Sequence, residues 1–197
     1  MARNRDPFAA ALRTLRERVV TGVFSPGLSI IILDEAKALG LSTTPVREAL
    51  AWLGGEGLIE RAPAGGYSGL RLDAAGLAGR YRLRRHCLRE GLARATLVGC
   101  RIEAPDDPDF FFRQIVAASA DAVIVDTFDR VQASLAPFAA IETELVGDMP
   151  DSLQVVARLL RDSALSEAAL ALDAFHERRI EVSPLLCLGA PPRAGAG

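Results

Sequence analysis

Residues 41–53 read LSTTPVREALAWL and decide how the chain around them is interpreted. Their apolar members recur at three- and four-residue spacing, at Val46, Ala49, Leu50 and Leu53. This spacing predicts a helix with one buried face. Ser42, Thr43 and Thr44 can each cap its start, and Pro45 is tolerated in a first turn because the N–H groups there have no intrahelical partner. The segment therefore predicts a short turn that leads into an amphipathic helix.

The polar side chains of this segment fall away from the apolar stripe. Thr43, Thr44 and Arg47 lie at the exposed beginning of the expected helix. Hydroxyl and guanidinium groups in such a position suit phosphate oxygens and the base edges of a DNA major groove. The alternative is a capped surface helix with one solvated arginine, and these residues alone favour neither interpretation.

The neighbouring segments favour the first interpretation. Asp6-Pro7 opens a helix that ends at Gly22, and a second helix is expected from Asp34 to Leu39, where Gly40 stops it. With the helix after Ser42 this makes a helix-turn-helix. Two strands, residues 58–61 and 67–72, then flank a turn rich in proline and glycine. Three helices followed by a hairpin predict a winged helix over residues 1–72.

The runs GVFSPG from Gly22, ALGLSTTPVREAL from Ala38, EGLI from Glu56 and GGY from Gly65 resemble the GntR family of bacterial transcription regulators. The resemblance implies that the helix after Ser42 reads the major groove and that the wing glycines approach the minor groove. The DNA-binding residues that it implies are Ser42, Thr43, Thr44, Arg47, Gly65 and Gly66. Many members carry arginine where this chain has Thr43, so we expect a different or more relaxed operator, with Arg47 as the main remaining contact.

Charge divides the 197-residue chain. Residues 1–72 hold nine Lys/Arg and seven Asp/Glu, residues 73–101 hold seven and two, and residues 102–197 hold seven and sixteen. The acidic last part favours a separate domain that does not bind DNA. No apolar run reaches the 18 residues of a membrane span, and the first residues lack an apolar signal region. We therefore expect a cytoplasmic protein.

The second domain is expected to be all-helical, over residues 73–183, with a flexible tail over 184–197. Asp73 can cap a long helix from Ala74 to about Val98, whose apolar stripe is interrupted by Arg84. A buried arginine needs an anionic partner: an internal carboxylate, one at an interface, or the carboxylate of a ligand. Further helices are expected over residues 109–119, 122–145 with a bend at Pro137, 152–161 and 166–181.

Residues 111–119, FFRQIVAAS, are similar to a stretch of the FadR-type branch of these regulators, whose helical FCD domain binds a small effector and dimerises. The short helical part resembles the VanR-like subgroup. Many such domains bind a divalent metal through one aspartate and three histidines. Here Pro108, Phe112 and Ser152 occupy three of those positions, with Asp109 nearby, and only His176 is retained. We therefore expect no bound metal and no cofactor.

The effector-pocket candidates are Arg84, Phe112 and His176. Phe110, Phe111 and Phe112 are consecutive and cannot share one helix face, so at least one is expected to fill the former effector cavity. The domain then binds an apolar ligand, or it serves dimerisation alone. His176 can equally be a hydrogen-bonded histidine without a ligand role.

The cysteines Cys87, Cys100 and Cys187 are far apart in sequence, which favours small core side chains over a redox switch. His86 and Cys87 are adjacent on a helix and point apart, which argues against a catalytic pair. Phosphate-binding glycine loops and nucleophile motifs are lacking, so an enzyme is not expected.

The sequence thus predicts a homodimeric, effector-responsive transcription regulator, most simply a repressor on a near-palindromic operator. The alternative is a winged-helix interaction or architectural module with weak, unspecific DNA binding and no effector.

Overall fold

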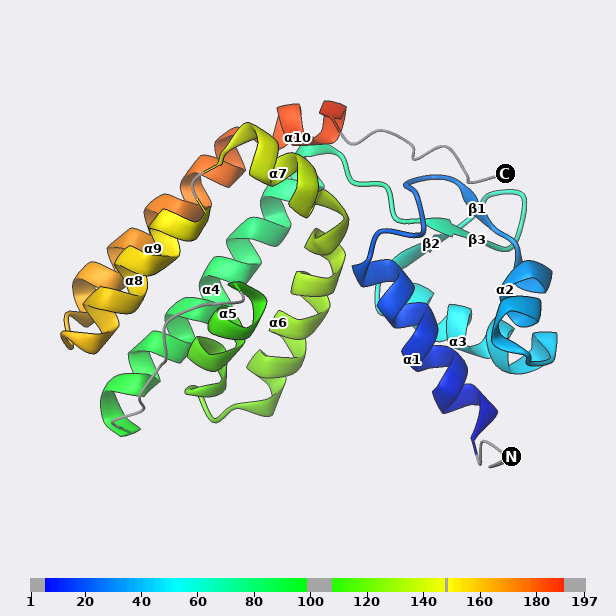
Figure 1. The fold of residues 1–197 in the computed structure, drawn as a ribbon, viewed down its shortest axis with the longest axis horizontal. Coiled ribbons are helices and arrows are strands. Elements are labelled where there is room, and N and C mark those ends of the chain that lie inside the picture. The colour runs from blue at the N-terminus through cyan, green and yellow to red at the C-terminus, as the bar shows by residue number, and fades with distance from the viewer. Residues whose placement is uncertain (1–5, 99–107, 148, 190–197) are drawn as a thin grey trace. The chain divides into compact units, whose positions relative to one another are not determined.

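The computed structural model describes residues 6–98, 108–147 and 149–189. Its internal contacts divide the chain into two units, with the boundary between Leu72 and Asp73. The first unit combines three helices with a small antiparallel sheet, and the described part of the second is helical (Figure 1). The expected fold class, a winged helix followed by an all-α domain, is confirmed.

Three helices form most of the first unit: α1 (Pro7–Val20), α2 (Ile32–Leu39) and α3 (Thr43–Gly55). The Asp6 carboxylate accepts a hydrogen bond from the Ala9 N–H at 3.0 Å, so it caps α1 as expected. Helix α2 begins two residues before Asp34 and ends at Gly40, whose φ of 63° is left-handed. Glycine adopts this conformation without steric cost, so the chain can turn sharply there into α3.

The sheet contains three short strands: β1 (Ser29–Ile30), β2 (Ile59–Arg61) and β3 (Tyr67–Gly69). β3 lies in the middle and pairs antiparallel with both neighbours, so that Ser68 faces Ser29 on one side and Glu60 on the other. The hairpin of β2 and β3 was expected, although β3 ends at Gly69 rather than residue 72. β1 was not expected, because two residues give no detectable alternation and their partner lies almost forty residues later.

The second unit contains α4 (Ala74–Val98), α5 (Pro108–Ala117), α6 (Ala122–Leu135), α7 (Ala139–Leu145), α8 (Met149–Arg161), α9 (Leu165–Glu181) and α10 (Ser183–Gly189). The expected break at Pro137 is present as a 3₁₀ turn, Ala136–Phe138, between α6 and α7. The expected flexible tail is wrong in its first part, because α10 occupies residues up to 189 and buries Leu186 completely.

Helix α4 is the central element of the second unit and packs against α5, α6, α9 and α10 (Figure 1). Its buried residues include Leu77, Tyr81, Leu88 and Leu92. A core of apolar side chains surrounds its second half, among them Phe112, Ile115, Phe128, Val156, Leu172 and Phe175. At roughly 1.5–3 kcal/mol for each large apolar side chain, burial of this cluster is the main source of the unit's stability.

A buried ionic network joins three helices of this unit. The Tyr81 hydroxyl of α4 donates to one Glu142 oxygen of α7 at 2.6 Å, and the Arg179 guanidinium of α9 donates to the other. Arg179 also lies over the Phe175 ring, 3.3 Å from its centroid. The pKa of the Tyr81 hydroxyl is raised, mainly by burial and then by the Glu142 charge. Each charge in the network therefore has a partner, as burial requires.

Gly91 is the point of closest approach between α4 and α5. A Cβ at this position would lie 2.2 Å from the carbonyl oxygen of Ile115 and 2.9 Å from the Val116 Cα. Both neighbours are backbone atoms and cannot rotate away. The absence of a side chain at Gly91 thus sets the distance between the two helices.

We expect Gly91→Ala to destabilise the protein by about 1–3 kcal/mol, because α5 must move outward to admit the methyl group. Gly79→Ala is the matched control on the same helix, where an added Cβ meets nothing within 4 Å. It should instead stabilise by up to about 1 kcal/mol through helix propensity. Urea unfolding of both variants measures the difference, and equal stabilities would show that the α4–α5 contact is looser than described.

Candidate functional site

Helix α3 presents one buried and one exposed face. Val46, Ala49, Leu50 and Leu53 are fully buried and face α1, whose Ala11, Leu15 and Val19 are also buried. The exposed face begins with Ser42 and Thr44 and continues with Arg47 and Glu48, while Thr43 is half-buried. The predicted buried stripe is confirmed. The candidate DNA-binding residues of this helix therefore share its outward side.

Several contacts fix the orientation of α3. Trp52 packs edge-on against Phe8 of α1, with ring centroids 6.1 Å apart, and its indole N–H donates to Glu56 at 2.9 Å. Arg16 of α1 pairs with the same Glu56 carboxylate at 2.7 Å. Arg18 of α1 pairs with Glu35 of α2. The pKa of Glu35 is raised by burial, which the charge of Arg18 opposes. These contacts hold the last turn of α3 against α1 and join α1 to α2.

Arg47 forms no ion pair or hydrogen bond with any residue in the described parts of the chain. Ser42 has the extended backbone of an N-cap, yet its hydroxyl makes no capping hydrogen bond. Both polar groups therefore remain available to an external partner. The guanidinium offers a planar set of donors that matches a guanine edge or a phosphate.

The wing is the turn between β2 and β3. Gly65 and Gly66 lie at its exposed tip with φ of 94° and 82°, and an added Cβ at either would meet no atom within 4 Å. Arg61, at the end of β2, is exposed and makes no ion pair within the described residues. Sequence reasoning did not single out Arg61. A basic residue next to a glycine-tipped turn was the signal that could have identified it.

In the second unit the structure brings the three effector-pocket candidates together. Arg84 Nε lies 3.1 Å from His176 Nε2, and the guanidinium lies over the Phe112 ring at 5.1 Å from its centroid. Phe112 and His176 have ring centroids 6.2 Å apart. Phe111 and Phe112 are buried while Phe110 is 61% exposed, so two of the three consecutive phenylalanines fill the core.

Arg84 forms no ion pair with a carboxylate in the described part of the chain, so the internal partner is not found there and the interface and ligand alternatives stay open. Its hydrogen bonds go to His176 and to the Gln132 amide oxygen, at 3.2 Å, and one of its terminal nitrogens is buried without a partner. Glu142, a buried carboxylate of the same unit, is bonded to Tyr81 and Arg179. Burial lowers the pKa of Arg84, while the charge of Glu142 raises it. Rings of Tyr81, Phe112 and Phe175 surround the cation.

The potential metal ligands make hydrogen bonds with protein groups. His176 Nδ1 is 2.7 Å from the Leu172 carbonyl, and its other nitrogen faces Arg84, so both ring nitrogens are engaged. Asp109 accepts from Gln132 at 2.6 Å. The described residues contain no group of three or more His, Cys, Asp or Glu side chains arranged to hold a metal. Gln132, which links Asp109 to Arg84, was missed because an amide on a helix carries no sequence signal.

The cysteines differ in environment. Cys87 is fully buried in the core, and burial raises the pKa of its thiol. Cys187 is half-buried in α10, and burial also raises its thiol pKa. Cys100 lies outside the described residues. A raised pKa keeps a thiol protonated and unreactive, which agrees with a packing role for Cys87.

Three helices with a wing and a tight left-handed turn before α3 define a winged helix, and Arg47 is free on the exposed face of α3. Residues 9–68 match the model described as "Bacterial regulatory proteins, gntR family". An uncharacterized HTH-type transcriptional regulator of Agrobacterium vitis is 40% identical over 58 residues, which is 29% of this chain and 34% of that protein. This segment is therefore similar to the domain that gives the gntR family its model, and the chain spans about a third of the length of that curated relative.

Solved structures resemble both units. A GntR transcriptional regulator from Rhodococcus sp. RHA1 aligns with a TM-score of 0.72 and 18% identity, over 93% of this chain and 98% of that one. Escherichia coli McbR/YncC aligns with a TM-score of 0.68 and 16% identity, over 90% and 97%. At such identities the likeness concerns the fold alone.

None of the helices in the described parts is long and apolar enough to cross a membrane.

The environment of His176 predicts a pH-dependent stability. Burial and the nearby Arg84 charge hold the pKa of this imidazole well below its ordinary value. Below about pH 6.5 the unfolded chain binds a proton that the folded chain does not, so stability falls as the pH drops, by at most about 1.4 kcal/mol per pH unit. We expect His176→Gln, which retains an acceptor for Arg84, to remove this fall in stability at low pH. Urea unfolding between pH 7 and 5.5 measures both slopes, and equal slopes would contradict a neutral buried imidazole.

Proposed function

We propose that this protein is a sequence-specific transcription regulator of the GntR type, in its FadR-like branch, and most simply a repressor. The observation that carries the proposal is Arg47, which is exposed on α3 beside Thr44 and forms no ion pair or hydrogen bond within the described chain. A free guanidinium near the start of a recognition helix is the side chain best suited to read a guanine or bind a phosphate. Thr43 and Ser42 add hydroxyl groups on the same turn.

The wing supplies a second contact in this proposal. Gly65 and Gly66 carry no side chains that would keep the backbone away from a groove, and Arg61 adds a positive charge close by. Arginine is attracted to the negative potential of a narrow minor groove. We therefore add Arg61 to the six DNA-binding residues expected from the sequence.

The second unit is proposed to dimerise and to bind a small effector without a metal. Arg84 supports the effector role, because a buried guanidinium nitrogen without a partner is costly and an anionic ligand would relieve that cost. Two winged helices held by a dimer would bind the half-sites of a near-palindrome, and an effector that changed their separation would change operator affinity. The alternative is an architectural module with weak, unspecific DNA binding, which the threonine at position 43 favours.

Fluorescence anisotropy distinguishes the two functions. The protein is titrated onto DNA from upstream of its own gene and onto scrambled DNA of equal length, across a series of salt concentrations. A regulator binds the native DNA at least about a thousandfold more tightly than the scrambled DNA. Equal affinities that fall steeply with salt, on this and on other candidate operators, would support the architectural module.

We expect Arg47→Ala to weaken operator binding by about 1–3 kcal/mol for each half-site, while binding to scrambled DNA changes much less. Arg13→Ala is the matched control, since Arg13 is also exposed and lies on α1 of the same unit. It removes one positive charge and should lower both affinities equally and slightly. Unchanged operator affinity in Arg47→Ala, with the fold verified by circular dichroism, would exclude α3 as the reading helix.

A further inference from the structure

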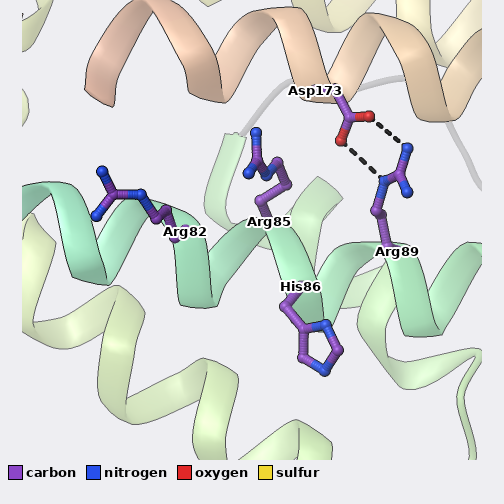
Figure 2. A pocket seen from close by; sticks show the side chains of 5 residues that line it. All are labelled: Arg82, Arg85, His86, Arg89 and Asp173. Carbon is purple, nitrogen blue, oxygen red and sulfur yellow. Dashed lines mark hydrogen bonds and ion pairs between the residues drawn. The ribbon is translucent and has the colours of Figure 1, made fainter. Parts of the chain in front are cut away.

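The outer side of α4 carries a row of basic side chains that the proposed function does not use. Arg82, Arg85 and Arg89 follow each other at three- and four-residue spacing, which places them along one side of the helix. Together with His86 and with Asp173 of α9 they line an open cleft of about 300 Å³. Figure 2 shows Arg85 and Arg89 extending from α4 toward α9, with Arg82 one turn earlier.

The carboxylates of α9 do not neutralise this row. Arg89 forms a two-pronged ion pair with Asp173, with Nε 2.9 Å from Oδ1 (Figure 2). Arg85 lies 3.2 Å from Glu177, whose side chain is 55% exposed and weakly held. Arg82 makes no ion pair or hydrogen bond within the described residues. Three guanidinium groups therefore face two carboxylates, and one of those two is free to swing into solvent.

Packing of the fold does not require these charges. Helix α4 is fixed to α9 by buried apolar residues, such as Leu88 and Leu92 against Leu172 and Phe175. Like charges at three- and four-residue spacing on a helix destabilise it. Repulsion between these guanidinium groups therefore destabilises α4, and an anion bound in the cleft would reduce that repulsion.

A second, larger cleft continues from the first. It measures about 710 Å³ and shares His86 and Arg89 with the basic cleft. Its other walls include Leu165, Ala169 and Leu170 of α9, and Leu170 is 64% exposed. The two clefts therefore form one groove along α4 and α9, with a cationic end and an end that exposes apolar side chains.

We propose that this groove binds a phosphate monoester with an apolar body. A phosphate group presents three terminal oxygens, enough to accept from the Arg82 and Arg85 guanidinium groups together. A carboxylate has one oxygen fewer for the same set of donors. The apolar body lies along Leu165 and Leu170, and the volumes match those of pockets for small molecules. The site is separate from Arg84 and His176 in the interior.

Isothermal titration calorimetry of the full chain tests the proposal with octyl phosphate, inorganic phosphate and 1-octanol as probes. We expect octyl phosphate to bind most tightly, and its affinity to fall with added salt. Arg82→Gln should weaken octyl phosphate binding about tenfold, because a charge-assisted hydrogen bond is lost. Leu170→Gln should weaken octyl phosphate alone and leave inorganic phosphate unchanged.

Arg158→Gln is the matched control, since Arg158 is exposed on α8 and lines neither cleft. It should bind octyl phosphate as the wild type does. Equal affinity of Arg82→Gln and wild type, or equal binding of 1-octanol and octyl phosphate, would overturn the proposal. A change in oligomeric state by light scattering in Arg82→Gln, without a change in phosphate affinity, would assign the row to a contact between copies. The titrations contain no DNA, so their outcome is independent of the proposed regulator function.

Discussion

Burial of one face of α3 against α1 is the constraint on which the winged-helix unit depends. Four apolar side chains of α3 are fully buried, and they fix the rotation of the helix about its axis. This rotation turns Thr44 and Arg47 outward. The ion pairs of Arg16 and Arg18 lie at the edge of the frame and contribute little each, because they are partly solvated. Apolar packing therefore positions the side chains that are proposed to read DNA.

In the helical unit two buried arginines have opposite environments. Arg179 has the Glu142 carboxylate, the Phe175 carbonyl and an aromatic face, so its charge is fully compensated. Arg84 has an imidazole, an amide and three aromatic rings, which stabilise a cation less than a carboxylate does. Glu142 is bonded to Tyr81 and Arg179, and within the described residues no carboxylate forms an ion pair with Arg84, although burial lowers its pKa and the charges of Glu142 and Asp109 oppose that lowering. The difference explains why Arg179 is a structural residue and Arg84 remains a candidate for ligand binding.

Periodicity predicted the features that depend on neighbours in sequence. The α3 stripe, the α4 stripe with its buried Arg84, and the break at Pro137 all follow from spacing and from local steric rules. Features that depend on distant partners were missed. β1 exists only because β3 pairs with it, and Gln132 matters only because α6 lies beside α4. Residues 184–189 were misread as part of a flexible tail because Pro184 and the glycine-rich end suggested one, whereas burial of Leu186 stabilises a helix there.

Whether an arginine is already paired with a carboxylate helps to identify candidate binding residues, which amino-acid composition alone does not. The chain is slightly acidic overall, which by itself argues against DNA binding. In the described structure, however, Arg18, Arg89, Arg113 and Arg179 are held by carboxylates, while Arg47, Arg61 and Arg82 are not. A held guanidinium has already exchanged its water for a fixed partner, so recruiting it to a ligand means breaking an ion pair. A free one keeps its full charge and all five donors for an external anion. Freedom alone does not mark a binding site, since Arg13 and Arg158 are also exposed and unpaired. Arg47, Arg61 and Arg82 stand out because each also lies at a proposed binding surface, on α3, beside the wing and at the cleft of α4.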